Sequence, residues 1–405
     1  MTTFKKIADF DVARFMGGRS KLGKYFDGFW RDLFVGHNNA FPDEVMCGAF
    51  DWNGETIWTP CGYEHAFNTW SRIGQFVAHV KSDEAGQQET QYAYRCGDAR
   101  GNNIIFGDNR ILWCATSYKN VDVQSIYKAK ESSTFDARHL TVTRDGSVVF
   151  TDGQMLNILA RSDTGTAEFL THKIPLDKGI NWFKLLENDL DSDFSYIAVC
   201  TAKRTATALD EPNRITLISL KNNSVFNRVE VNGTQTFSRH PKKEEMVVLG
   251  QKLTVLSLPD LKTVNAIELP LMGKERNMNP AHSRVEHSPN GQYFALAYTA
   301  KGDVEIRDTH SLEIIQTFDG QGRLLTDMSW NSTGEYLACG FRDRNGREKI
   351  ELIVWDMKSH KTVFRISTGN KKVDAFPTVV YRWSPLAAEL ACLVDNQRIQ
   401  IFGLR

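Results

Sequence analysis

The feature that most constrains this chain is an internal repeat of four short apolar segments, which is clearest in the C-terminal half. Residues 283–318 and 326–366 follow one order, in which an apolar segment and a polar turn precede three further apolar segments. The turns read Ser-Pro-Asn-Gly and Asn-Ser-Thr-Gly, and both are typical of links between antiparallel strands. Four short strands per unit predict the blade of a β-propeller, so we expect an all-β chain.

Weaker copies of the same unit precede these two. They span residues 45–80, 90–117, 138–162, 181–231 and 234–269, and the last stretch, 378–404, supplies three strands and then stops. Counting this incomplete unit predicts about eight four-stranded blades. Seven blades remain an alternative if one irregular N-terminal unit is an insertion.

The incomplete last unit predicts how the blades are closed. A strand from the N-terminal region can complete it and so hide both sheet edges. Residues 30–37 are the preferred strand, and residues 4–12 are the competing one. With the first choice the chain divides into an N-terminal arm, 1–29, and a single propeller domain, 30–405.

Several blade ends resemble those of the WD-repeat family. The third segment of one unit ends in Val354, Trp355 and Asp356, and Arg307 and Asp308 hold the same place one unit earlier. Near the N-terminus a Gly-His pair at 36–37 precedes an Asn-Thr-Trp triplet at 68–70 at about the family's spacing. The resemblance implies a WD40-like β-propeller. It also implies structural roles for His37, Trp70, Asp308, Trp355 and Asp356.

Composition limits the kinds of partner. Lys plus Arg and Asp plus Glu both number 49, so no global positive field attracts the chain to nucleic acid or to an anionic membrane. No apolar run reaches the roughly 18 residues of a membrane span, and the charged N-terminus does not read as a signal peptide. The seven cysteines are widely spaced without a CxxC pair, which predicts reduced core thiols and a cytoplasmic or nuclear location.

Motifs for catalysis are missing from the sequence. It contains no GxSxG elbow, no Walker loop and no histidine pair at metal-ligand spacing. Acidic residues recur at similar blade positions, which the repeat explains without catalysis, although a carboxylate pair for glycoside hydrolysis could in principle be chosen from them. We therefore predict no catalytic residue, no metal and no cofactor.

Residues at the starts of the blades differ in chemistry although their positions are equivalent. In WD-type proteins such positions border the central channel on the binding face. The resemblance therefore implies partner binding by the residues at these starts, which are Tyr92, Arg138, Trp182, Arg284, Asp327 and Thr378.

The predicted arm mixes basic and aromatic residues, and its cations Arg19, Lys21 and Lys24 are further partner-binding candidates. Such a mixture can bind RNA through phosphate contacts and base stacking. An arm that packs its aromatics against the blades would have the same composition, and we favour packing or protein contact. Residues 341–349 form a second basic segment.

Three functions remain open from the sequence. The preferred one is a non-enzymatic adaptor or complex subunit that binds other proteins on the rim of the blades and through the arm. The alternatives are an RNA- or ribosome-associated propeller of the translation-factor type, and a propeller hydrolase with acids and histidines in its channel.

Overall fold

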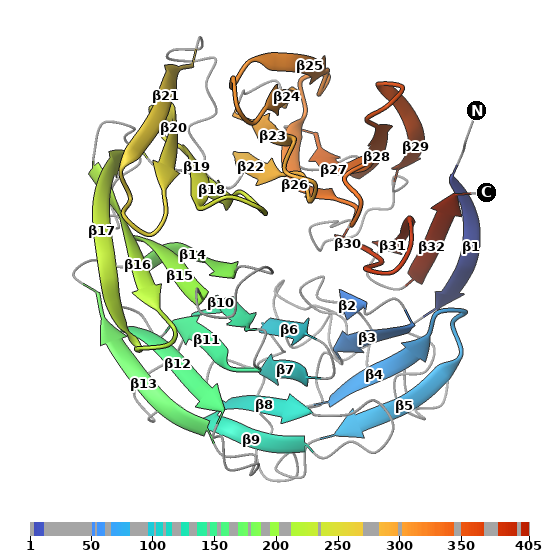
Figure 1. The fold of residues 1–405 in the computed structure, drawn as a ribbon. Coiled ribbons are helices and arrows are strands. Elements are labelled where there is room, and N and C mark those ends of the chain that lie inside the picture. The colour runs from blue at the N-terminus through green and yellow to red at the C-terminus, as the bar shows by residue number, and fades with distance from the viewer. Residues whose placement is uncertain are drawn as a thin grey trace, which may run out of the picture. The chain divides into compact units, whose positions relative to one another are not determined.

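A computed structural model shows the chain as a series of strands. It describes residues 4–11, 51–52, 55–60, 66–81, 96–100, 103–107, 111–115, 123–128, 136–143, 146–151, 155–161, 169–176, 180–187, 195–201, 212–233, 236–269, 283–298, 302–343, 350–367, 380–394 and 398–404. Every regular element in these ranges is a β-strand. The strands form eight four-stranded sheets, which confirms the predicted repeat and fits the count of eight (Figure 1).

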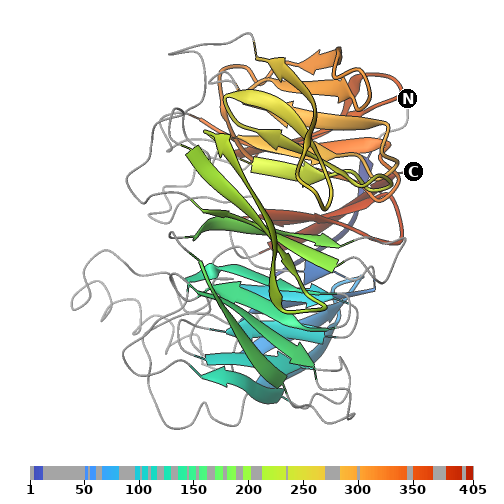
Figure 2. The ribbon, with the colours of Figure 1, turned by 60° about the vertical axis from the view of Figure 1, so that its left-hand side comes forward.

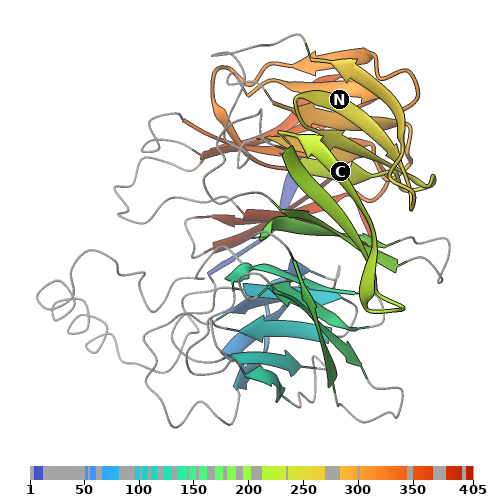
Figure 3. The ribbon, with the colours of Figure 1, turned by 90° about the vertical axis from the view of Figure 1, so that its left-hand side faces the viewer.

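The chain divides into two compact units, and the larger contains residues 1–4 and 130–371. It holds five sheets, each built from four consecutive strands. The first is β10 (Asp136–Val142), β11 (Val148–Thr151), β12 (Met155–Arg161) and β13 (Phe169–Pro175). The second is β14 (Ile180–Glu187), β15 (Ser195–Thr201), β16 (Pro212–Ser219) and β17 (Ser224–Asn232). Figures 2 and 3 show the twist of their strands from the side.

The other three sheets of this unit follow in chain order. The third is β18 (Thr236–Arg239), β19 (Glu245–Leu249), β20 (Lys252–Ser257) and β21 (Thr263–Glu268). The fourth is β22 (Arg284–His287), β23 (Tyr293–Ala297), β24 (Val304–Asp308) and β25 (Ile314–Phe318). The fifth is β26 (Leu324–Trp330), β27 (Tyr336–Arg342), β28 (Ile350–Asp356) and β29 (Lys361–Ser367).

The second unit, residues 5–129 and 372–405, contains three sheets. One is β2 (Asp51–Trp52), β3 (Thr56–Pro60), β4 (Ala66–Ser71) and β5 (Phe76–Lys81). The next is β6 (Cys96–Arg100), β7 (Asn103–Gly107), β8 (Ile111–Ala115) and β9 (Val123–Lys128). The last joins β30 (Val380–Trp383), β31 (Glu389–Val394) and β32 (Arg398–Leu404) to β1 (Phe4–Asp11).

The core of the larger unit lies between its sheets. One apolar cluster joins each successive pair, and the cluster between the fourth and fifth sheets contains Phe318, Phe341 and Trp355. The second strand of a sheet is almost wholly buried, whereas an outer strand such as β17 alternates between exposed and half-buried residues. This gradient explains the sequence pattern, because a strand covered on both faces is apolar throughout and an outer strand is not.

A register shift recurs between the third and fourth strands of most sheets. Ile306 pairs with Gln316 and Arg307 with Ile314, so Ile315 is an extra residue in the outer strand. The same shift occurs next to Trp70, Trp113, Ile218, Leu256 and Trp355. A β-bulge adds a residue that bends and twists its strand. It also leaves Ile315 on the surface, where it is 44% exposed.

The strand that completes the last sheet is β1, so the preference for residues 30–37 was wrong and the competing segment is correct. Ile7, Ala8 and Phe10 pack against the apolar cluster that contains Trp70 and Ile401. Charged side chains of this segment are compensated, because Asp9 accepts hydrogen bonds from Arg398 and from Lys6. These bonds outweigh partial burial and hold the pKa of Asp9 below its usual value. Residues 30–37 and the boundary at residue 30 lie outside the described ranges.

Candidate binding surface

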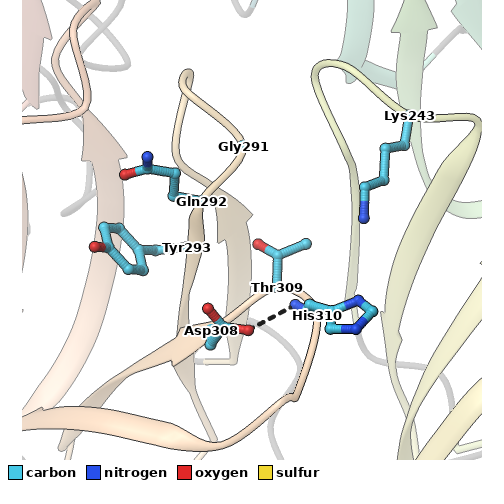
Figure 4. A pocket seen from close by; sticks show the side chains of 7 residues that line it. All are labelled: Lys243, Gly291, Gln292, Tyr293, Asp308, Thr309 and His310. Atoms are coloured by element: carbon cyan, nitrogen blue, oxygen red, sulfur yellow. Dashed lines mark hydrogen bonds between the residues drawn. The ribbon is translucent and has the colours of Figure 1, made fainter.

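A recess opens between the third and fourth sheets of the larger unit, at the end of the blades where the first strand turns into the second. Its volume is about 360 Å³. Seven residues from three turns line it, and Figure 4 shows them: Lys243, Gly291, Gln292, Tyr293, Asp308, Thr309 and His310.

Local sequence fixes the turn between β22 and β23. The Ser288 hydroxyl donates to Asn290 Oδ1 at 2.7 Å and accepts from the Tyr293 amide at 3.1 Å. The Gly291 amide donates to the Ser288 carbonyl at 2.8 Å, and Gly291 has a φ of +74°. Side-chain to backbone bonds of this kind are the reason that Ser, Asn and Gly dominate tight turns. The Ser-Pro-Asn-Gly motif therefore builds one wall of the recess.

The turn between β24 and β25 forms a second wall. Asp308 Oδ1 accepts hydrogen bonds from the backbone amides of His310 at 2.9 Å and Ser311 at 2.8 Å. The bond from Ser311 is the largest of the influences that lower the pKa of Asp308. Asp308 is thus ionised at neutral pH, and it holds Thr309 and His310 in a fixed turn.

His240 ties the third sheet to the fourth. Its Nδ1 lies 2.9 Å from the backbone amides of Lys242 and Lys243, and its Nε2 lies 3.0 Å from the Gly291 carbonyl. Nδ1 accepts both amide hydrogens, so the neutral ring carries its proton on Nε2 and donates it to Gly291. Burial favours this neutral form and lowers the pKa of His240. The Thr309 amide donates to the Gln292 carbonyl at 3.1 Å, which links the other two turns.

Three groups at this recess have unused hydrogen-bonding capacity. The Lys243 ammonium makes no ion pair with any residue that the structure describes. Thr309 Oγ1 is buried and has no hydrogen-bond partner among the described residues, and the His310 ring is exposed. Buried hydroxyls are normally bonded, so such an atom at the edge of a recess indicates a place for a ligand or a water. Together the groups offer donors from two blades.

Arg284 and Asp327, two of the predicted rim residues, lie at the other end of the strands. Arg284 begins β22, and its guanidinium donates to the carbonyls of Ser283 at 3.0 Å and Thr326 at 3.4 Å. Asp327 lies in β26, next to the register shift there, and its Oδ1 accepts from the Met328 amide. Both side chains are half-buried. Arg284 therefore joins the starts of neighbouring blades.

The other partner-binding candidates are only partly covered by the structure. Arg138 lies in β10 and Trp182 in β14, and only their backbone is described. The remaining ones lie outside the described residues: Tyr92, Thr378, Arg19, Lys21 and Lys24.

The predicted structural residues occupy positions that suit such roles. Trp355 is 4% exposed and stacks on Phe318 with ring centroids 4.4 Å apart. Asp356 Oδ1 accepts from the Lys358 amide at 2.8 Å, as Asp308 does in its own turn. Trp70 is fully buried beside Phe10. His37 lies outside the described ranges.

Other chemistry is limited in the described part of the chain. There, no group of three or more His, Cys, Asp or Glu residues could hold a metal ion. No helix in the same residues is long and apolar enough to cross a membrane. The thiols of Cys200, Cys339 and Cys392 are free and buried, and burial raises the pKa of each of them. A thiol of this kind is unreactive.

The recess was not predicted from the sequence. Its residues come from three turns that are separated by about 50 and about 17 positions in the chain. A signal was nevertheless present, because the repeat places both first turns at the same end of their blades. Aligning residues 240–244 with residues 288–292 makes the two turns equivalent. Equivalent turns of neighbouring blades lie side by side, which would have placed His240 and Lys243 near Gly291.

Comparison with known proteins identifies the fold. The match to the C-terminal WD40 domain of Sif2 covers 100% of this chain and 99% of the Sif2 chain, with a TM-score of 0.64 and 8% identity. The match to Sqt1 of Saccharomyces cerevisiae covers 90% of this chain and 98% of the Sqt1 chain, with a TM-score of 0.63 and 10% identity. The match to the dihydro-heme d1 dehydrogenase NirN, in complex with DHE, covers 80% of this chain and 66% of the NirN chain, with a TM-score of 0.55 and 14% identity.

The same comparisons limit what can be carried over. No protein-family model and no curated protein sequence matches the chain. At such low identities the structural matches show the fold, which is a WD40-like β-propeller, as the Trp-Asp blade ends implied.

Proposed function

We propose that this WD40-like propeller is a non-enzymatic scaffold that binds other proteins through rigid turns at the ends of its blades. The recess lined by Lys243, Thr309 and His310 carries the proposal. Its walls are fixed by His240 and Asp308, so ligand binding there would cost little conformational entropy. Binding residues on loops that a rigid framework positions are the usual arrangement for recognition.

The size of the recess agrees with recognition of a macromolecule. A volume of about 360 Å³ is at the lower limit of the range for small-molecule pockets, and this recess is open and polar. It therefore suits one or two side chains of a larger partner. The surrounding turns and outer strands would supply the rest of a standard interface of roughly 800 Å² per partner.

The rim at the blade starts is a second proposed surface, as are the basic residues Arg19, Lys21 and Lys24 of the arm. Arg284 supports the proposal for the rim, because it spans the starts of two blades, so that one partner could contact both blades. Interface hot spots are rich in Arg and Trp, which fits Arg284 and Trp182. The free thiols of the core favour a reducing compartment, so we place the scaffold in the cytoplasm or the nucleus.

The test is affinity purification of the full chain from its native cells, followed by identification of the proteins that co-purify. Lys243→Ala and Arg284→Ala probe the two ends of the blades, and Lys361→Ala on the outer strand β29 is the matched control. We expect at least one protein to be captured by wild type and control and lost from one probe variant with an unchanged melting temperature. Capture of RNA alone, or of nothing, would refute a protein scaffold.

A further inference from the structure

We propose that the recess binds the carboxylate of an acidic side chain on a partner protein, an inference that rests on the proposed scaffold function. Lys243 approaches from the third sheet, and Thr309 and His310 line the recess from the fourth, with the Thr309 methyl on the Lys243 side in the view of Figure 4. An ammonium, a hydroxyl and an imidazole N–H are all donors that a carboxylate oxygen accepts. A bond between an ionised donor and an ionised acceptor is roughly twice as strong as a neutral one.

The charges around the recess support an anionic ligand. Two cations of the third sheet are already paired, Arg239 with Glu244 and Lys262 with Asp260, whereas Lys242 does not line the recess. Lys243 makes no such pair with the described residues, although it lies next to Glu244 in the chain. His240 accepts the Lys243 amide and so fixes the backbone from which the ammonium reaches the recess.

Asp308 decides which anion fits. Its carboxylate also lines the recess and repels any anion there. The two backbone amides on Oδ1 offset part of its charge. The Lys243 ammonium supplies one positive charge, which can compensate the single charge of a carboxylate, whereas a phosphoryl dianion would bring a second charge that Asp308 repels. A carboxylate is therefore favoured over a phosphate, and an acidic peptide over a phosphopeptide.

The unused Thr309 hydroxyl makes the site more specific than a surface lysine. Its oxygen is buried and has no hydrogen-bond partner in the described structure. Because this oxygen has almost no exposed surface, the Thr309 side chain must turn about its Cα–Cβ bond for a carboxylate to bridge Lys243 and Thr309, and the bridge would then satisfy both groups. By contrast, the guanidinium of Arg284 on the rim is already bound to two carbonyls, so the rim offers fewer free donors to an acidic side chain.

The test measures binding of fluorescently labelled hexaglutamate to the purified full chain at low salt, by anisotropy. Hexaglutamine and inorganic phosphate are the comparison ligands. The variants are Lys243→Ala, Lys243→Arg and Thr309→Val. The matched control is Lys262→Ala, whose side chain is exposed and belongs to the same sheet. Thermal melting of each variant accompanies the titration.

We expect wild type and Lys262→Ala to bind hexaglutamate alike, and Lys243→Ala to bind about tenfold more weakly. Lys243→Arg should restore most of the binding, and Thr309→Val should weaken it without changing the melting temperature. Equal binding by Lys243→Ala and wild type would overturn the proposal, as would equal binding of hexaglutamine. Tighter binding of phosphate would identify a phosphoryl site instead. If co-purification detects partners while hexaglutamate fails, only this inference is lost.

Discussion

At the scale of single residues, Arg307 shows how the repeat accepts an unlike side chain. Trp355 stacks on Phe318 of the preceding blade, whereas Arg307 holds the same place one unit earlier and is 4% exposed. Its Nε donates to Glu305 at 2.8 Å, and its Nη1 donates to the Leu312 carbonyl at 2.7 Å. Tyr298 donates to the other oxygen of Glu305 at 3.2 Å. Burial, together with Glu305, raises the pKa of Tyr298 to about 12.

This network predicts an asymmetric response to substitution. Arg307→Ala should lower the free energy of unfolding by about 3–5 kcal/mol, because it leaves Glu305 charged and buried without its partner. The double variant Glu305→Leu, Arg307→Met should cost much less, since no unpaired charge remains. Urea unfolding measures both. A single variant no less stable than the double variant would contradict the ion pair.

At the scale of elements, the clamp between the first turns of two sheets depends on a glycine. An added Cβ at Gly291 would lie 2.7 Å from His240 Cε1, and its φ of +74° is unfavourable for other residues. Gly322 has nearly the same φ, +73°, but an added Cβ there would meet no atom within 4 Å. The pair separates the steric effect from the conformational one.

We therefore expect Gly322→Ala to cost about 1 kcal/mol and Gly291→Ala to cost clearly more. Urea unfolding gives the two free energies. Gly291→Ala should also weaken hexaglutamate binding, because it displaces the turn that faces Lys243. Equal losses of stability in the two variants would show that His240 does not restrict this turn.

The strand β1 supports a second prediction at this scale. Without it, one edge of β32 would be unpaired, and Trp70 would lose its contact with Phe10. Deletion of residues 1–11 should then lower the melting temperature and promote aggregation. Deletion of residues 1–3, which precede the strand, is the control. Equal melting and light scattering for the two truncations would show that β1 does not stabilise the sheet.

The sequence predicted the individual strands better than the contacts between distant segments of the chain. All eight units appeared as short apolar segments separated by polar turns, because a blade is defined by local patterns. The closing strand was misassigned, because the Gly-His pair at 36–37 matched the WD-repeat pattern. Arg398, the partner of Asp9, lies at the other end of the chain, so no local pattern indicated that residues 4–12 pair with β32. The recess was missed for the same reason, since contacts between turns of different blades are not encoded in any single turn.

At the scale of the whole molecule, the WD40-like fold explains rigidity but not choice of partner. The matched structures include both WD40 domains and a dehydrogenase, so a fold of this class can support different activities. Function must be argued from the surface. Here the recess provides free donors between turns that His240 holds in place, whereas the rim residue Arg284 is engaged in joining two blades.

The central claim is that a protein partner binds at the recess end of the blades. It is tested most directly by hydrogen–deuterium exchange of the full chain, alone and with the main co-purifying protein. We predict slower exchange in residues 241–244, 291–293 and 308–310 of the complex, and a smaller change at residues 284 and 326–327. Protection confined to the blade starts, with unchanged exchange in the three turns, would contradict the account.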